Sequence, residues 1–238
     1  MEDVNRFGPE LALLIAAGLI IVIDAVLPAA APGRGPARRT LSVALGLFGA
    51  AASAGWSLAL LLADDRGKAF HGMLVVDDYS FFFGFLFAGI AAIIVLASVE
   101  FIQKHRFQAE YVALVLTSAA GMMLMAATVD LVAIFVALEL QSISFYILVA
   151  FLKDARSSEA SLKYLLLGAV STALTLYGMA YLFGVSGSTN LDDIAKFLVA
   201  HDLPNSPITT SDGRLVGLIR REDVSRRVIE ENQRNRTA

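Results

Sequence analysis

Apolar residues along this chain are gathered into six long runs, and most charged residues fall between the runs. A helix rises about 1.5 Å per residue, so roughly 20 apolar residues cross a hydrocarbon core about 30 Å thick. Each run has about this length, which predicts six membrane-spanning helices. The helices are expected over residues 10–28, 40–63, 80–102, 110–128, 130–152 and 159–186.

Small residues recur every four positions in the second predicted helix, as Ser42, Gly46, Ala50 and Ala54. Such a stripe allows another helix to approach closely, and we interpret it as a packing surface. The first run could instead be a signal peptide, because small residues follow it at 29–31. Asp24 interrupts that run, however, and its apolar region is longer than a signal peptide needs, so we expect a retained helix.

The segment after about residue 200 is polar and has a different pattern. It predicts an extended piece ending near Thr210, a turn at 211–213, a strand over 214–220 and a charged helix from about Glu222. The sequence therefore predicts an all-α polytopic membrane protein of about six helices over residues 1–199. A small soluble α+β tail follows over residues 200–238.

Composition supports the membrane assignment and excludes several function classes. Hydrophobic residues make up 57% of the chain and the mean hydropathy is +0.67, which is too apolar for a soluble domain. A net charge of −3 gives no basis for nucleic-acid binding. Without cysteine there is no thiolate for zinc or iron–sulfur ligation, and three scattered histidines predict no metal site. Any redox centre is therefore expected on another chain.

Basic residues are concentrated in alternate connections between the predicted helices. The connections after the first, third and fifth helices carry Arg34, Arg38, Arg39, Lys104, Arg106, Lys153 and Arg156. By the positive-inside rule these connections are cytoplasmic, which places the N-terminus and the tail outside. We expect a multi-pass protein of the bacterial inner membrane, in contact with lipid.

One charged residue lies inside a run, because Glu139 is near the middle of the fifth predicted helix. A charge at that depth costs about 2.5–3.5 kcal/mol on insertion scales, so an intramembrane acid marks a candidate functional site. Ser142 and Tyr146 follow at i+3 and i+7, on the same side of the helix. We interpret Glu139 as a proton-handling residue. The alternative is a protonated acid that only fixes packing against a neighbouring helix.

Lys163 lies near the start of the sixth predicted helix. Its long side chain can snorkel to the membrane interface. Alternatively it faces the bundle and acts on Glu139, because a nearby cation favours the ionised carboxylate. The two residues are on different helices, so both interpretations remain open.

The residues from about 110 to 191 resemble a known family of membrane subunits. The matching pieces are EYVALVLTSAAGMMLMAATVDLVAIFVALELQSISFYILVAF and RSSEASLKYLLLGAVSTALTLYGMAYLFGVSGSTNL. Both are similar to the antiporter-like subunits of proton-translocating NADH:quinone oxidoreductase, respiratory complex I. Sister subunits carry a Trp beside the glutamate of the fifth helix, where this chain has Leu138, which favours the subunit N branch.

The resemblance implies that Glu139 matches the proton-path glutamate of the fifth helix and Lys163 the lysine that opens the sixth. It implies a subunit of a redox-driven translocase that works beside other complex I membrane subunits. NADH, FMN, iron–sulfur clusters and quinone would be bound by partner subunits, with no cofactor on this chain. The family's chain continues into a broken seventh helix and a second inverted repeat, so we expect a truncated subunit.

The tail resembles the second half of a cystathionine-beta-synthase (CBS) motif, in which a D-G-x-h-x-G-h-h strand precedes a helix opening with R-x-D. Asp223 would match the acid that contacts a nucleotide ribose, while Arg220 stands where Ser or Thr is usual. Two alternatives to a complex I subunit therefore stay open. One is a membrane ion transporter regulated by nucleotides through this tail, and the other is a truncated fragment without function.

Overall fold

The computed structural model describes residues 2–26, 35–102, 107–200, 205–209 and 215–220. Within these ranges six helices are long and apolar enough to cross a membrane, which confirms the predicted all-α polytopic fold. They are α2 (Gly8–Val26), α3 (Gly35–Leu62), α4 (Asp78–Ala97), α6 (Gln108–Ala127), α7 (Leu131–Val149) and α8 (Ala155–Ser186). The short helices α1 (Glu2–Arg6) and α5 (Val99–Ile102) flank α2 and α4.

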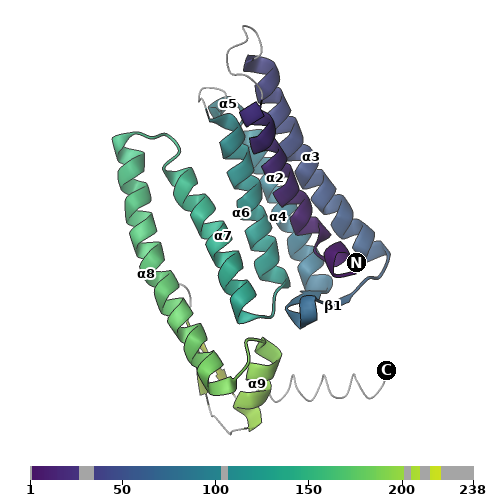
Figure 1. The fold of residues 1–238 in the computed structure, drawn as a ribbon, viewed down its shortest axis with the longest axis vertical. Helices are drawn as coiled ribbons and strands as arrows, with labels where there is room; N and C mark the ends of the chain where they lie inside the picture. The colour runs from purple at the N-terminus through teal and green to yellow at the C-terminus, as the bar shows by residue number, and fades with distance from the viewer. Residues whose placement is uncertain (1, 27–34, 103–106, 201–204, 210–214, 221–238) are drawn as a thin grey trace. The chain divides into compact units, whose positions relative to one another are not determined.

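Four of these helices, α2, α3, α4 and α6, pack side by side as a bundle (Figure 1). Helix α6 contacts each of the other three, and it is the most completely buried of them. The centre of the bundle consists of apolar side chains that are almost fully enclosed. They include Leu13, Ile20, Val95, Val112 and Leu116.

Small residues on α3 allow its neighbours to come close, as the sequence predicted. Ser42, Gly46 and Ala50 of the predicted stripe are buried. A Cβ atom on Gly46 would lie 2.5 Å from Cγ1 of Val112 on α6. The structure adds Gly49, where a Cβ atom would overlap the Cβ of Ala16 on α2. Contact between α2 and α3 therefore requires a glycine at position 49.

A short hairpin connects α3 to α4 at one end of the bundle. Strands β1 (Gly67–Ala69) and β2 (Leu74–Val76) pair antiparallel around a 3-10 turn, η1 (Phe70–Gly72). Asp77 then caps α4, because its side chain accepts a hydrogen bond from the backbone N–H of Ser80 at 2.9 Å. The hairpin and this cap fix where α4 enters the bundle.

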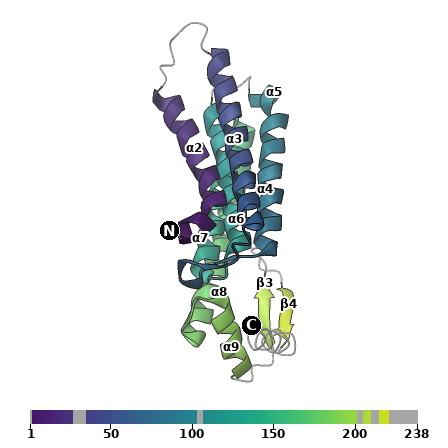
Figure 2. The same ribbon diagram turned by 90° about the vertical axis from the view of Figure 1, so that its right-hand side faces the viewer.

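A second unit comprises residues 129–132 and 165–238, so it holds the C-terminal part of α8. Helix α9 (Leu191–Ala200) follows directly after Asn190, whose side chain accepts a hydrogen bond from Asp192 N at 2.9 Å. Strands β3 (Asn205–Thr209) and β4 (Leu215–Arg220) form an antiparallel hairpin (Figure 2). These strands lie where the sequence predicted extended segments. The predicted turn, the charged helix and Asp223 lie outside the described residues.

Candidate functional site

Helix α7, which carries Glu139, lies very close to α6 at a glycine. A Cβ atom on Gly121 would lie 3.0 Å from the backbone N of Gln141 and 3.1 Å from the carbonyl O of Ala137. Ala137 has no exposed surface at all. Because residues i and i+4 share one face of a helix, Ala137 and Gln141 define the side of α7 that faces α6.

Glu139 lies on the opposite side of α7, because a step of two residues turns a helix by about 200°. The residue is half-buried. Its Oε1 atom is buried and has no hydrogen-bond partner among the described residues. A buried polar atom without a partner is uncommon and costly, which is why such atoms often mark functional positions.

Ser142 and Tyr146 share this side of α7, as the sequence predicted, and the first turns of α8 pack against it. The rings of Tyr146 and Tyr164 meet edge to face with centroids 4.9 Å apart. The Ser161 hydroxyl donates a hydrogen bond to the Tyr146 carbonyl O at 2.8 Å. The side of α7 that carries Glu139 therefore continues into a contact between α7 and α8.

An exposed apolar stripe runs beside Glu139 on the same helix. It consists of Val132, Val136, Ile143 and Ile147, each about half exposed. Their spacing places them on one face of α7 that the described part of the chain leaves uncovered. Glu139 therefore stands at the border between an open apolar face and the side packed on α8.

Lys163 is placed away from Glu139. Its ammonium group lies 2.5 Å from a carboxylate oxygen of Glu159, one turn earlier on α8, and its side chain is 71% exposed. Ser161 and Tyr164 face α7, whereas Glu159 and Lys163 project from the other side of α8. The structure thus brings Glu139 and Tyr146 to one side of α7 and leaves Lys163 in an exposed ion pair.

Asp154 fixes the start of α8 and so the position of Lys163. Its carboxylate accepts a hydrogen bond from the Ser157 backbone N–H at 2.6 Å, and the Ser157 hydroxyl lies 3.1 Å from Asp154 N. The hydrogen bond from the Ser157 backbone, followed by that with the Ser157 side chain, holds the pKa of Asp154 below its ordinary value. The helix start is therefore capped by an ionised carboxylate at neutral pH.

Asp130 fixes the start of α7 in a similar way. Its side chain is buried, accepts a hydrogen bond from Val132 N at 2.9 Å, and accepts another from the Thr189 hydroxyl at 2.5 Å. Leu131 N also donates to the Thr189 carbonyl O at 2.8 Å. The G-S-T-N-L segment after α8 is thus bonded to the first residues of α7, and the buried Asp130 carboxylate has a structural role.

Sequence reasoning missed a second buried acid, Glu10, in the first turn of α2. Its signal in the sequence was an acid directly after Pro9, where the first apolar run begins. Only 7% of its surface is exposed. Within the parts of the chain that the structure describes, no three His, Asp or Glu side chains converge as metal ligands.

A family model described as NADH:quinone oxidoreductase/Mrp antiporter, TM, matches residues 128–216. This range includes α7, α8, α9 and β3. Subunit N of NADH-quinone oxidoreductase from Dehalococcoides mccartyi is 40% identical over 219 residues, covering 90% of this chain and 42% of that protein. Subunit N 1 from Koribacter versatilis is also 40% identical, covering 87% of this chain and 43% of its own length. The chain thus spans less than half the length of these curated relatives.

Two solved structures share the fold. Respiratory complex I from Thermus thermophilus contains a chain 28% identical in sequence, with a TM-score of 0.60, covering 84% of this chain and 44% of that one. The membrane-bound sulfane sulfur reductase, an archaeal respiratory membrane complex, has a chain 23% identical with a TM-score of 0.66. That match covers 79% of this chain and 39% of the other.

Proposed function

Because this chain belongs to the antiporter-like family that includes subunit N of NADH-quinone oxidoreductase, we propose that it works in the membrane arm of such a complex. There it takes part in proton translocation coupled to quinone reduction. The observation that carries the proposal is the combination of a subunit N sequence with a buried, unpartnered carboxyl oxygen on Glu139, inside a membrane-spanning helix.

Glu139 is the residue that holds the translocated proton in this proposal. A nearby charge acts more strongly on a carboxyl in low-dielectric surroundings than on one in water, so a movement of such a charge would load or unload Glu139. Lys163 is the candidate modulator of its proton affinity. Because Lys163 is exposed and paired with Glu159, this role requires its ammonium group to leave that ion pair.

The partner chains in this proposal supply all redox chemistry. This chain has no cysteine, so iron–sulfur clusters belong on other subunits, together with NADH, FMN and quinone. The open apolar stripe on α7 and the exposed apolar residues of α8 are suited to lipid or to the helices of neighbouring membrane subunits. We place the chain in the bacterial inner membrane with its N-terminus outside, as the distribution of basic loops predicts.

The nucleotide-regulated transporter has weaker support than this proposal. The family match continues to residue 216, through β3 and into the tail whose sequence resembles half of a CBS motif. Asp223, the residue expected to contact a nucleotide, remains a prediction.

Affinity purification of the tagged full chain from membranes of its source organism tests the proposal. We expect the eluate to oxidise NADH with quinone as acceptor and, after reconstitution into liposomes, to pump protons. The matched control is a chain with residues 201–238 deleted, which we expect to co-purify with the same activity. A chain that purifies alone, or that responds to adenine nucleotides only when the tail is present, would contradict the proposal.

A further inference from the structure

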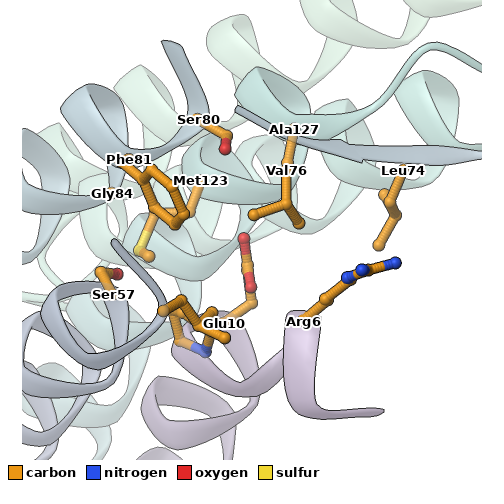
Figure 3. Close-up of a pocket in the computed structure, with 12 residues that line it drawn as sticks. Arg6, Glu10, Ser57, Leu74, Val76, Ser80, Phe81, Gly84, Met123 and Ala127 are labelled. Atoms are coloured by element: carbon orange, nitrogen blue, oxygen red, sulfur yellow. The ribbon is translucent and has the colours of Figure 1, made fainter. Parts of the chain in front are cut away.

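A small cavity lies where the bundle meets the β1–β2 hairpin (Figure 3). It is bounded by the first turn of α2, by α3, α4 and α6, and by strand β2. Its volume is about 20 Å³, which is enough for one water molecule. Its lining residues include the polar residues Glu10, Ser57 and Ser80. A cavity of this size with polar groups on several sides can hold a hydrogen-bonded water.

Glu10 points into this cavity, with its carboxyl group between Ser57 and Val76 (Figure 3). The residue is more than nine-tenths buried, at 7% exposure. Its Oε2 atom has no hydrogen-bond partner among the described residues. The carboxyl group is therefore withdrawn from bulk water while one of its oxygens still needs a partner.

Arg6 is the other charged residue on the cavity wall, but its guanidinium is already engaged. Its Nε and a terminal nitrogen lie 2.9 and 2.7 Å from Oδ1 of Asp65, and the other terminal nitrogen donates to the Lys68 carbonyl O at 2.8 Å. Among the described residues, helices α3, α4 and α6 and strand β2 contribute no titratable side chain to the wall. Asp65 thus neutralises Arg6, the one cation that the described part of the chain places on this wall.

We propose that Glu10 and this cavity form a proton-binding site distinct from Glu139, in which the neutral carboxyl of Glu10 hydrogen-bonds one enclosed water molecule. Moving a carboxyl group from water into a buried site without an ionic partner costs the least free energy when the carboxyl is neutral. The water satisfies the otherwise unpartnered oxygen. Arg6 lines the cavity, and its ion pair with Asp65 is partly exposed, at 17% and 26% of the two side chains.

This inference does not depend on the proposed function, because proton binding at Glu10 is measured on the full chain alone in lipid nanodiscs. Infrared difference spectra of wild type against Glu10→Gln are expected to show the loss of one carboxylic-acid C=O band. The band should shift in D2O, since the proton exchanges through the enclosed water. Glu139→Gln should leave this band unchanged. Loss of carboxylate bands instead would show that Glu10 is ionised, and would overturn the proposal.

A methyl group added to the cavity wall tests whether a water molecule is bound there. A Cβ atom on Gly84 of α4 would lie 3.2 Å from the Ser57 hydroxyl and 3.6 Å from Cε of Met123, both side-chain atoms that can adjust. Gly84→Ala should displace the water and move the Glu10 C=O band to higher frequency, as for a carboxyl that loses a hydrogen bond. In the control Gly89→Ala, on the same helix, the added Cβ atom has no neighbour within 4 Å, so the band should stay in place. An unchanged band in Gly84→Ala would contradict the water-bound site.

Discussion

In the proposed complex, replacement of Glu139 by glutamine is expected to remove most of the proton translocation. Glutamine keeps the shape of the side chain and its capacity for hydrogen bonds, but it cannot release a proton. We expect pumping to fall to roughly a tenth or less, which corresponds to a barrier raised by about 1.4 kcal/mol or more. Assembly should be intact, because Oε1 of Glu139 has no hydrogen-bond partner to lose among the described residues.

The measurement is the pH gradient that the proposed complex, purified and reconstituted, forms during NADH oxidation. Glu100→Gln is the matched control, because it makes the same chemical change on an exposed carboxylate of α5. It should pump like wild type. If Glu139→Gln pumped like the control, Glu139 would have only the packing role that the sequence left open.

Replacement of Gly49 by leucine is expected to cause the largest loss of stability in the bundle. A Cβ atom at this position would overlap the Cβ of Ala16, and Ala16 has no flexible side chain that could move aside. Helices α2 and α3 would therefore have to separate. Inserting atoms into a close-packed contact usually lowers the free energy of unfolding by about 1–3 kcal/mol, and we expect a loss of about 3 kcal/mol here.

Gly55→Leu on the same helix is the matched control, since its Cβ would meet nothing within 4 Å. The free energy of unfolding, measured in mixed detergent micelles, should change by no more than about 0.5 kcal/mol in this variant, as for surface substitutions in general. Equal losses for the two variants would mean that leucine is poorly tolerated anywhere on α3, and that the α2–α3 contact is not the cause.

The six membrane helices could be predicted because hydrophobic length alone decides whether a helix can span a bilayer. The stripe on α3 was also predictable, since small residues at i+4 spacing leave few other interpretations. Gly49 was not, because its importance depends on where Ala16 of α2 lies. Such a contact between different helices is not encoded in the spacing of either one.

The candidate site was only partly predictable for the same reason. The sequence located Glu139 and the side of α7 that it shares with Tyr146. It left two options for Lys163, because the rotation of α8 about its axis is set by contacts such as that of Ser161 with α7. Glu10 was missed because an acid in the first turn of a helix usually caps it at the surface. The β1–β2 hairpin contributes to its burial, because Val76 of β2 lines the same cavity together with residues of α3, α4 and α6.

Side-chain accessibility at position 139 tests most directly whether this acid faces protein rather than lipid. The chain has no cysteine, so Glu139→Cys, Val136→Cys and Ile143→Cys each introduce a single thiol. In nanodiscs, a lipid-soluble thiol reagent should label the variants at 136 and 143, whose native side chains are about half exposed. It should label Glu139→Cys at least about tenfold more slowly, equivalent to about 1.4 kcal/mol of added barrier. Equal labelling at all three positions would place residue 139 against lipid and contradict an enclosed proton-binding acid.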